Sequence, residues 1–378
     1  MALRSGMPRA HVCPDGAVGN NRTVTVLVPA HNEEELIGQT LMSLRHQTQP
    51  ADRVIVIADN CTDRTVEVAL HQDVEVFETV ANSEKKGGAL NQVLSRLLCD
   101  LGHDDLVLVT DADSRIDDSF IEIAARTLES RPEVGAVGGV FFGDDEGGLV
   151  GALQRSEYVR YAREIARKQG RAVVLTGTAS MFRAQVFAQV AKERGRLLPG
   201  RRGDVYDTEA LTEDNEITLA IKTLGWLTVS PRECRVTTEV MTTWRDLWVQ
   251  RLRWQRGALE NLRRYGVTRV TAPYLAKQLA MYLGMVAVAL FLVATVLAVS
   301  RWGLGLPQGI WLGVTLIFVV ERIWTVRLAG WRAVALAAPL ALEFAYDIFQ
   351  QMVYLQAAID VIFDRTAVWN RVDPIPEL

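Results

Sequence analysis

The chain has few residues suited to soft-metal sites and no excess of positive charge. Its 378 residues include four cysteines, none at the spacing of a zinc site or a redox motif. The 41 basic side chains are outnumbered by 45 acidic ones, so we expect no nucleic-acid partner, because phosphate contacts need a basic face. Residues 1–22 lack the apolar run of a signal peptide and are predicted to form a flexible N-terminal arm.

Long apolar runs are absent from residues 23–262 but dominate the C-terminal quarter. Residues 279–299 carry no charge and are long enough to cross about 30 Å of hydrocarbon as a helix. Further apolar stretches follow at 304–320 and 333–363. We predict a membrane-associated helical region over residues 263–378 with two or three membrane helices. Arginines between the second and third stretches predict a cytosolic loop, and so a cytosolic catalytic domain at the plasma (inner) membrane.

The third apolar stretch is unusual because it carries a polar stripe. Glu343, Asp347, Gln350 and Tyr354 are spaced by four, three and four residues, so they share one face of a helix. That face could line the interior of a helix bundle, form a subunit contact in a homo-oligomer, or lie at the membrane surface. The sequence leaves these three interpretations open.

Residues 23–262 alternate between short β-branched apolar runs and helical patterns. This order predicts an α/β fold with a mostly parallel central sheet and helices on both faces. Ligands bind such sheets beyond the carboxyl ends of the strands. Strands are predicted at 23–29, 53–58, 74–79, 105–110, 134–142 and 172–175, and helices at 33–47, 62–70, 89–98 and 154–168.

Two pairs of carboxylates are candidates for chemistry. Asp111-Ala112-Asp113 follows an apolar strand, and two carboxylates at a sheet rim suit a hard cation shared with substrate phosphates. The ordinary alternative is a pair of loop residues or helix caps. Glu213 and Asp214 follow Thr212 ahead of an amphipathic helix. They suit either a general base or a plain helix start.

Two further segments suit phosphate binding. In Lys85–Asn91 (KKGGALN) adjacent glycines allow close backbone approach and the lysines offer charge, although a plain loop before a helix is the simpler interpretation. In Gln250–Trp254 (QRLRW) Arg253 can grip phosphate oxygens and Trp254 offers a flat face for a sugar ring. The alternative there is a basic helix at a lipid surface.

In this order the segments resemble family 2 glycosyltransferases with a GT-A fold. Val28–Glu33 and Ile57–Thr65 are similar to the first two strand ends of that family, Lys86–Asn91 to its Lys-Gly-Gly-Ala-Leu-Asn segment, and Asp111–Asp113 to its metal motif. Thr212-Glu213-Asp214 and Gln250-x-x-Arg253-Trp254 are similar to the pair found in membrane-bound cellulose, hyaluronan and poly-N-acetylglucosamine synthases.

The resemblance implies a role for each segment. It implies an inverting transfer from a UDP-sugar, with N-acetylglucosamine or glucose as the sugar, to a hydroxyl of a carbohydrate or lipid-linked acceptor. Asp214, next to Glu213, would be the catalytic base, and Asp113 with Asp111 would hold Mn²⁺ or Mg²⁺. Gly177, Thr178 and Trp254 would contact the acceptor. The nucleotide sugar would be bound by Pro29, Ala30, His31, Glu33, Asp59, Lys86, Asp111, Ala112, Gln250, Arg253 and Trp254.

The sequence departs from the family in two ways. Many GT-A enzymes complete the metal site with a downstream histidine, but all five histidines here precede Asp111. The large synthases also have more membrane spans, which places polymer export by this chain in doubt more than it does sugar transfer. Three other functions stay open: transfer to a polyprenyl phosphate, a two-metal nucleotidyltransferase, and a silent membrane-anchored binding protein.

Overall fold

The computed structural model describes residues 22–303 and 341–365, with a few single positions between 313 and 325. These residues form two compact units. The first unit comprises the described residues up to Phe141 together with Gln169–Thr238, and the second comprises Phe142–Lys168 together with the described residues from Glu239 onward.

The first unit is built on a seven-stranded sheet with the order β3-β2-β1-β4-β8-β6-β9. Neighbouring strands run parallel except at β8, which is antiparallel to both β4 and β6. The predicted α/β fold with a mostly parallel sheet is therefore confirmed. The strands are β1 (Val24–Ala30), β2 (Arg53–Ala58), β3 (Glu75–Glu78), β4 (Leu106–Thr110), β6 (Val134–Gly138), β8 (Ala179–Arg183) and β9 (Leu227–Val229).

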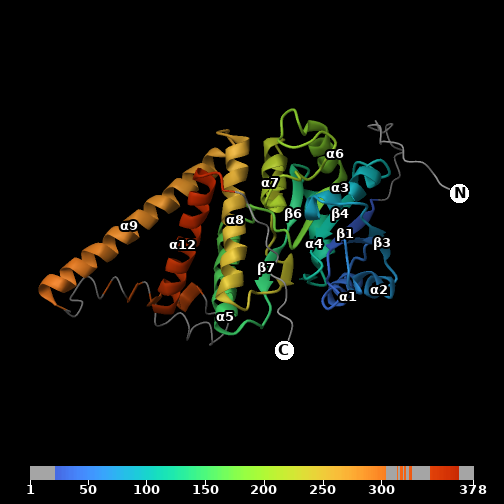
Figure 1. Ribbon diagram of the computed structural model, residues 1–378. Helices are drawn as coiled ribbons and strands as arrows, with labels where there is room; N and C mark the ends of the chain where they lie inside the picture. Colours follow the sequence, from blue (N-terminus) through green and yellow to red (C-terminus); the bar gives the residue numbers. More distant parts are fainter. Residues whose placement is uncertain are drawn as a thin grey trace. The chain divides into compact units, whose positions relative to one another are not determined.

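Helices cover both faces of this sheet because its central strands are apolar on both sides (Figure 1). One face packs against Ile37, Phe120 and other apolar residues of α1, α2 and α4. The other face contacts α3, α6 and α7. The helices are α1 (Ile37–Arg45), α2 (Thr65–Leu70), α3 (Lys85–Leu97), α4 (Phe120–Ser130), α6 (Ala184–Glu193) and α7 (Glu213–Thr223), and a small second sheet joins β5 (Arg115–Ile116), β10 (Arg235–Thr238) and β7 (Val140–Gly143).

Some local predictions were wrong. The single strand expected at 134–142 is two strands, β6 and β7, which belong to different sheets. The strand expected at 172–175 is irregular backbone, although Ala172 and Leu175 are buried, so its apolar pattern reports burial rather than pairing. The strand β8 was missed because its residues, Ala-Ser-Met-Phe-Arg, include no β-branched side chain. In addition, α3 begins at Lys85, four residues earlier than predicted. Its glycines are tightly packed: a Cβ at Gly88 would clash with the side chain of Asn82.

The second unit is helical and consists mainly of α5 (Gly148–Arg167), α8 (Trp244–Tyr265), α9 (Ala272–Trp302) and α12 (Ala341–Ile362). The polar stripe of α12 is used inside this unit. Glu343 is buried and accepts a hydrogen bond from Arg160 Nη1 at 2.8 Å, and Gln350 Nε2 donates to Glu157 Oε2 at 3.2 Å. Of the three interpretations of the stripe, the bundle interior holds for these two residues.

The helix α9 contains the first predicted membrane stretch, 279–299. It is 31 residues long, has a mean hydropathy of 2.6 over its most apolar window, and has no buried residue. By length and composition it can cross a membrane. The stretch at 304–320, residues 333–340 of the third stretch, and residues 1–21 of the predicted arm lie wholly or largely outside the described residues.

Candidate active site

The carboxyl ends of three neighbouring strands meet at one edge of the sheet. Ala30 at the end of β1 is in register with Ala58 at the end of β2, and Leu27 of β1 pairs with Val109 of β4. The segments that follow these strands, from His31, Asp59 and Asp111, therefore emerge side by side. The sequence motifs are brought together here by strand register rather than by proximity in the chain.

The two loops at the start of this edge are tied to each other. His31 Nδ1 donates to the carbonyl oxygen of Asp59 at 2.5 Å. The carboxylate Oδ1 of Asp59 accepts hydrogen bonds from Thr79 Oγ1 at 2.7 Å and from Asn82 Nδ2 at 2.8 Å. Pro29, Ala30 and Glu33 belong to the same edge, and the backbone N–H of Glu33 donates to Thr65 Oγ1. This part of the site is rigidly preorganised.

Lys86 connects the strand-end carboxylates to the helix α7. Its Nζ lies 2.5 Å from Asp111 Oδ1 and 3.2 Å from Glu213 Oε1. Burial opposes the charge on Lys86, but the neighbouring carboxylates, led by Asp111, outweigh burial and raise the pKa of the ammonium group. Burial also raises the pKa of Asp111 to about 6, against the opposing effect of Lys86. The ammonium group of Lys86 therefore pairs with one member of each candidate carboxylate pair, Asp111 and Glu213.

Asp113 is separated from Asp111 by Ala112, in a turn that follows β4. Its Oδ1 accepts a hydrogen bond from Ser114 Oγ at 3.0 Å. Ala112 between them is buried, and its carbonyl accepts from Thr40 Oγ1 at 2.7 Å. Two carboxylates on a fixed turn provide hard oxygen donors, which fit Mg²⁺ or Mn²⁺ completed by diphosphate oxygens. Within the described residues, no group of three or more His, Cys, Asp or Glu side chains could hold a metal ion.

The helix α7 begins at Glu213, so Glu213 and Asp214 lie in its first turn, where acidic side chains are stabilised by the helix dipole. A pocket in the first unit is lined by Lys86, Gly177, Tyr206, Glu213 and Asp214, among others. A Cβ placed on Gly177 would lie 3.5 Å from Asp214 Oδ2 and 3.6 Å from Lys86 Nζ. The structure thus brings Lys86, Gly177 and both candidate bases to one pocket.

Thr178 contributes its backbone to the strand end. Its carbonyl oxygen accepts from the backbone N–H of Asp111 at 3.1 Å and from Thr110 Oγ1 at 2.8 Å. Its own hydroxyl is buried and has no hydrogen-bond partner among the residues that the structure describes. The visible role of Thr178 is therefore to fix Asp111, while its predicted contact with an acceptor stays a prediction.

Sequence reasoning missed Tyr206, which lines the pocket from an irregular loop. Asn91 clamps the backbone of this loop: its Oδ1 accepts from the N–H groups of Val205 and Tyr206, and its Nδ2 donates to the carbonyl of Tyr206 at 2.8 Å. Tyr206 is 3% exposed, and burial raises the pKa of its hydroxyl group. Asn91 was within the quoted Lys-Gly-Gly-Ala-Leu-Asn segment, but no signal in the sequence pointed to its partner.

Gln250, Arg253 and Trp254 lie on α8 in the second unit. The guanidinium carbon of the intervening Arg251 lies 4.4 Å from the centre of the Trp254 ring. Arg251 also donates a hydrogen bond to Glu157 Oε2 at 3.1 Å. Tyr346 Oη donates to the same oxygen at 2.6 Å. Trp254 is therefore held in place within its own unit. The predicted contacts of these three residues with substrate stay predictions.

The sequence from residue 21 to residue 257 matches the model of a family described as glycosyltransferase like family 2. This chain belongs to that family. The GT-A fold is supported independently by a solved structure, a mannosyltransferase from Pyrobaculum calidifontis in complex with GDP-Man and Mn²⁺. It superimposes with a TM-score of 0.61 at 20% identity and covers 92% of this chain and 89% of its own.

Curated relatives include the poly-beta-1,6-N-acetyl-D-glucosamine synthases of Staphylococcus aureus and Staphylococcus epidermidis. The S. aureus protein (strain COL) is 24% identical over 66% of this chain and 58% of its own length, and the S. epidermidis protein is 25% identical over 64% and 56%. The chain thus spans less than two thirds of the length of these relatives. The chain is a family 2 glycosyltransferase that is similar in sequence to these polysaccharide synthases.

Proposed function

We propose that this glycosyltransferase moves a sugar from a UDP-sugar to a hydroxyl group of a carbohydrate or lipid-linked acceptor, with inversion at the anomeric carbon. The observation that carries the proposal is the position of Lys86 between Asp111 and Glu213, at a pocket that Asp214 also lines. The ammonium group of Lys86 thus lies beside Asp111, where the diphosphate leaving group would bind, and lines the same pocket as the candidate base Asp214. N-acetylglucosamine is the first candidate sugar because the curated relatives are named for it.

The chemistry assigned to the residues is a single displacement. Asp214 accepts the proton of the acceptor hydroxyl as its oxygen bonds to the anomeric carbon, and the bond from that carbon to the diphosphate breaks. Lys86 stabilises negative charge on the departing UDP. Asp111 and Asp113 would hold Mn²⁺ or Mg²⁺, and such a cation would neutralise the diphosphate. The edge from Pro29 to Glu33, with Asp59, would hold the nucleotide.

Membrane attachment is a second part of the proposal. The support is α9, which has the length and composition of a membrane helix and exposes its apolar side chains. Arg263, Arg264 and Arg269 precede α9, and Lys277 lies near its start, before the uncharged stretch 279–299. Positive residues that flank a span favour the cytosolic side. We therefore propose that the catalytic domain faces the cytosol, where nucleotide sugars would reach it.

The experiment that tests the function is a donor screen. Membranes containing the full chain are incubated with Mn²⁺ and, separately, with UDP-N-acetylglucosamine, UDP-glucose, UDP-galactose and GDP-mannose, and the released nucleoside diphosphate is measured. We expect release with one of the UDP-sugars and a product whose mass increases by one or more sugar residues. Asp214→Asn membranes are the control.

Other outcomes of the screen would indicate a competing function or contradict the proposal. Release of a sugar 1-phosphate in place of UDP would indicate a nucleotidyltransferase, because attack on the α-phosphate of the donor transfers UMP and leaves the β-phosphate on the sugar. A polyprenyl phosphate sugar as product, formed equally well by Asp214→Asn, would indicate an acceptor that is already an anion and needs no base. No turnover of any donor would contradict the proposal.

A further inference from the structure

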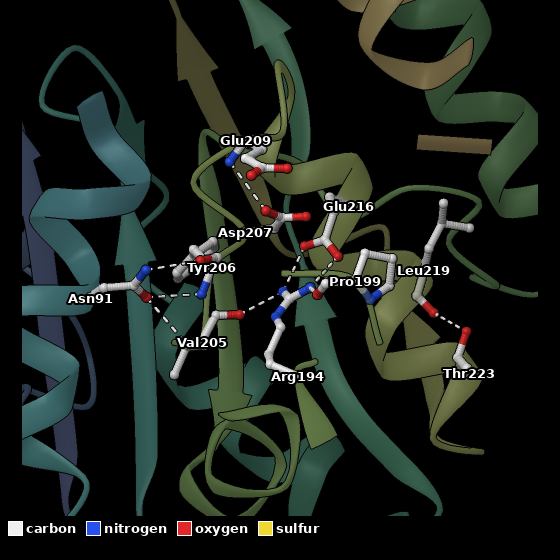
Figure 2. A network of polar contacts seen from close by, with 10 residues as sticks. All are labelled: Asn91, Arg194, Pro199, Val205, Tyr206, Asp207, Glu209, Glu216, Leu219 and Thr223. Carbon is white, nitrogen blue, oxygen red and sulfur yellow. Dashed lines mark hydrogen bonds and ion pairs between the residues drawn. The ribbon is translucent and has the colours of Figure 1, made fainter. Parts of the chain in front are cut away.

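A buried ion pair joins α6 to α7 in the first unit (Figure 2). Arg194 follows the last residue of α6, and Glu216 lies in α7; their side chains are 0% and 1% exposed. The guanidinium group binds both carboxylate oxygens, with Nη2 at 2.7 Å from Oε2. The same group donates to the carbonyl of Pro199 at 2.8 Å and to that of Val205 at 2.7 Å.

A pair of this kind is weak evidence for stability, because desolvation of two charges offsets most of their attraction. Its value lies in geometry, since a planar guanidinium with several fixed acceptors tolerates little movement of any of them. Here the acceptors come from two chain segments, the loop after α6 and the first two turns of α7. Arg194 therefore fixes these two segments relative to each other.

The start of α7 carries the candidate base. Asp214 and Glu216 are two residues apart on α7, so their side chains point about 200° apart around the helix axis. Asp214 lines the pocket, whereas Glu216 is directed to Arg194. The bond from Glu216 to Arg194 therefore sets the rotation of the helix start and, with it, the direction of the Asp214 carboxylate.

The loop after α6 carries Tyr206. Arg194 holds the carbonyl of Val205, and the next residue, Tyr206, is clamped through its backbone by Asn91 of α3, as Figure 2 shows. Lys86 lies on the same helix as Asn91. Tyr206, Lys86 and Asp214 thus line one pocket and are supported by one connected set of polar contacts.

We propose that Arg194 is a positioning residue that fixes Asp214 and Tyr206 relative to each other across the pocket, so that an acceptor hydroxyl meets the base in a reactive geometry. This inference rests on the proposed function, in which Asp214 accepts the proton. It assigns to Arg194 no contact with substrate, because its side chain is fully buried.

The test compares Arg194→Lys with Arg183→Lys in the full-length chain. Arg183 is a matched control: it is 4% exposed, it donates to the carbonyls of Val134, Leu128 and Arg131, and it pairs with Leu106 at the opposite end of β4 from Asp111. Both substitutions keep the positive charge but remove the planar guanidinium group and its fixed set of N–H donors. Glu216→Gln is a second variant, which keeps the shape of the side chain but removes its charge, in case Arg194→Lys does not fold.

We expect Arg194→Lys to lower kcat by about 10²-fold, the cost of a misplacement near 1 Å, while affinity for UDP with Mn²⁺ is retained. Arg183→Lys should lose thermal stability but keep kcat. Hydrogen exchange should speed up in residues 199–216 of Arg194→Lys and not of Arg183→Lys. Equal losses of kcat in both variants, in step with stability, would overturn the proposal.

The exchange measurement also separates this inference from the proposed function. If the wild-type chain turned over no donor, the proposed function would fail, yet faster exchange at 199–216 in Arg194→Lys would still support the positioning contact. Unchanged exchange in that segment, with Arg194→Lys folded, would refute the contact whatever the activity. Glu216→Gln should also speed up exchange at 199–216, because it removes the charge that Arg194 binds.

Discussion

The two carboxylate pairs of the candidate site are positioned by different means. Asp111 and Asp113 follow the buried strand β4 and are fixed by backbone contacts, including the bond from Asp111 N–H to the carbonyl of Thr178. Glu213 and Asp214 begin a helix whose start is fixed by a side-chain ion pair, from Glu216 to Arg194. The strand end is rigid because it belongs to a sheet, whereas the helix start depends on distant side chains.

This difference matches the work that each pair is proposed to do. A diphosphate and its cation need a fixed platform, which a sheet edge provides. Proton transfer needs a base within hydrogen-bond reach of the acceptor, so small rotations of the helix start change the rate. Lys86 contacts both pairs. The comparison therefore predicts that binding and turnover can be separated by substitutions at the two pairs, but not by substitution of Lys86.

The largest expected effect is at the helix start. Asp214→Asn removes the proton acceptor without changing the shape of the side chain, so we expect turnover to fall by about 10²–10⁴-fold. Affinity for UDP with Mn²⁺ should be retained. Steady-state release of UDP and calorimetry measure the two quantities. The exposed carboxylate variant Asp118→Asn is the control, and near-normal turnover of Asp214→Asn would show that another group is the base.

The next effect is at the strand end. Asp113→Ala removes a proposed metal ligand, and because even outer-shell changes weaken metal sites by about 10–100-fold, we expect a loss of metal-dependent UDP affinity of at least about 10²-fold. Calorimetry with and without Mn²⁺ measures it, and Asp118→Asn again serves for comparison. Equal UDP affinity of the wild-type chain with and without Mn²⁺ would contradict the metal assignment.

Substitution of Lys86 should lower nucleotide affinity and turnover together, because Lys86 contacts both carboxylate pairs. Lys86→Met keeps the length of the side chain but removes the charge, and a charged hydrogen bond contributes about 1.5–3 kcal/mol. We expect UDP affinity and kcat each to fall by about ten- to a hundredfold. Lys85→Met, on the preceding residue, is the control. A loss confined to one quantity would mean that Lys86 serves only one carboxylate pair.

The comparison also explains what the sequence could predict. The β-branched runs before Ala30, Asp59 and Asp111 indicated buried parallel strands, and parallel strands bring their carboxyl ends to one edge. The strand-end residues of the site followed from that pattern. The strand β8 did not, because its five residues lack β-branched side chains and are placed by pairing with β4 and β6.

The contacts that hold the helix start were beyond the reach of sequence patterns. Arg194 reaches Glu216 over 22 positions, and Asn91 reaches Tyr206 over 115. Neither pair has a spacing that helical or strand periodicity predicts. The polar stripe of α12 was visible in the sequence, but its partners Arg160 and Glu157 on α5 had to come from the structure. The periodicity of a sequence shows which residues share one face of a helix, but the residues that this face contacts are known only from the fold.

The smallest expected effect concerns Thr178, whose backbone serves the strand end. Its hydroxyl is buried and, within the described part of the chain, makes no hydrogen bond. Thr178→Val removes this hydroxyl and keeps the shape and the backbone carbonyl that Asp111 uses. Removing an unsatisfied buried polar group should leave the melting temperature unchanged or raise it slightly, with turnover unaffected. Thermal unfolding and acceptor KM measure this, with Thr110→Val, which loses a real hydrogen bond at 2.8 Å, as the destabilised control. A clear rise in acceptor KM in Thr178→Val would instead place this hydroxyl in the acceptor site, as the sequence prediction has it, and would require the strand end to open during the reaction.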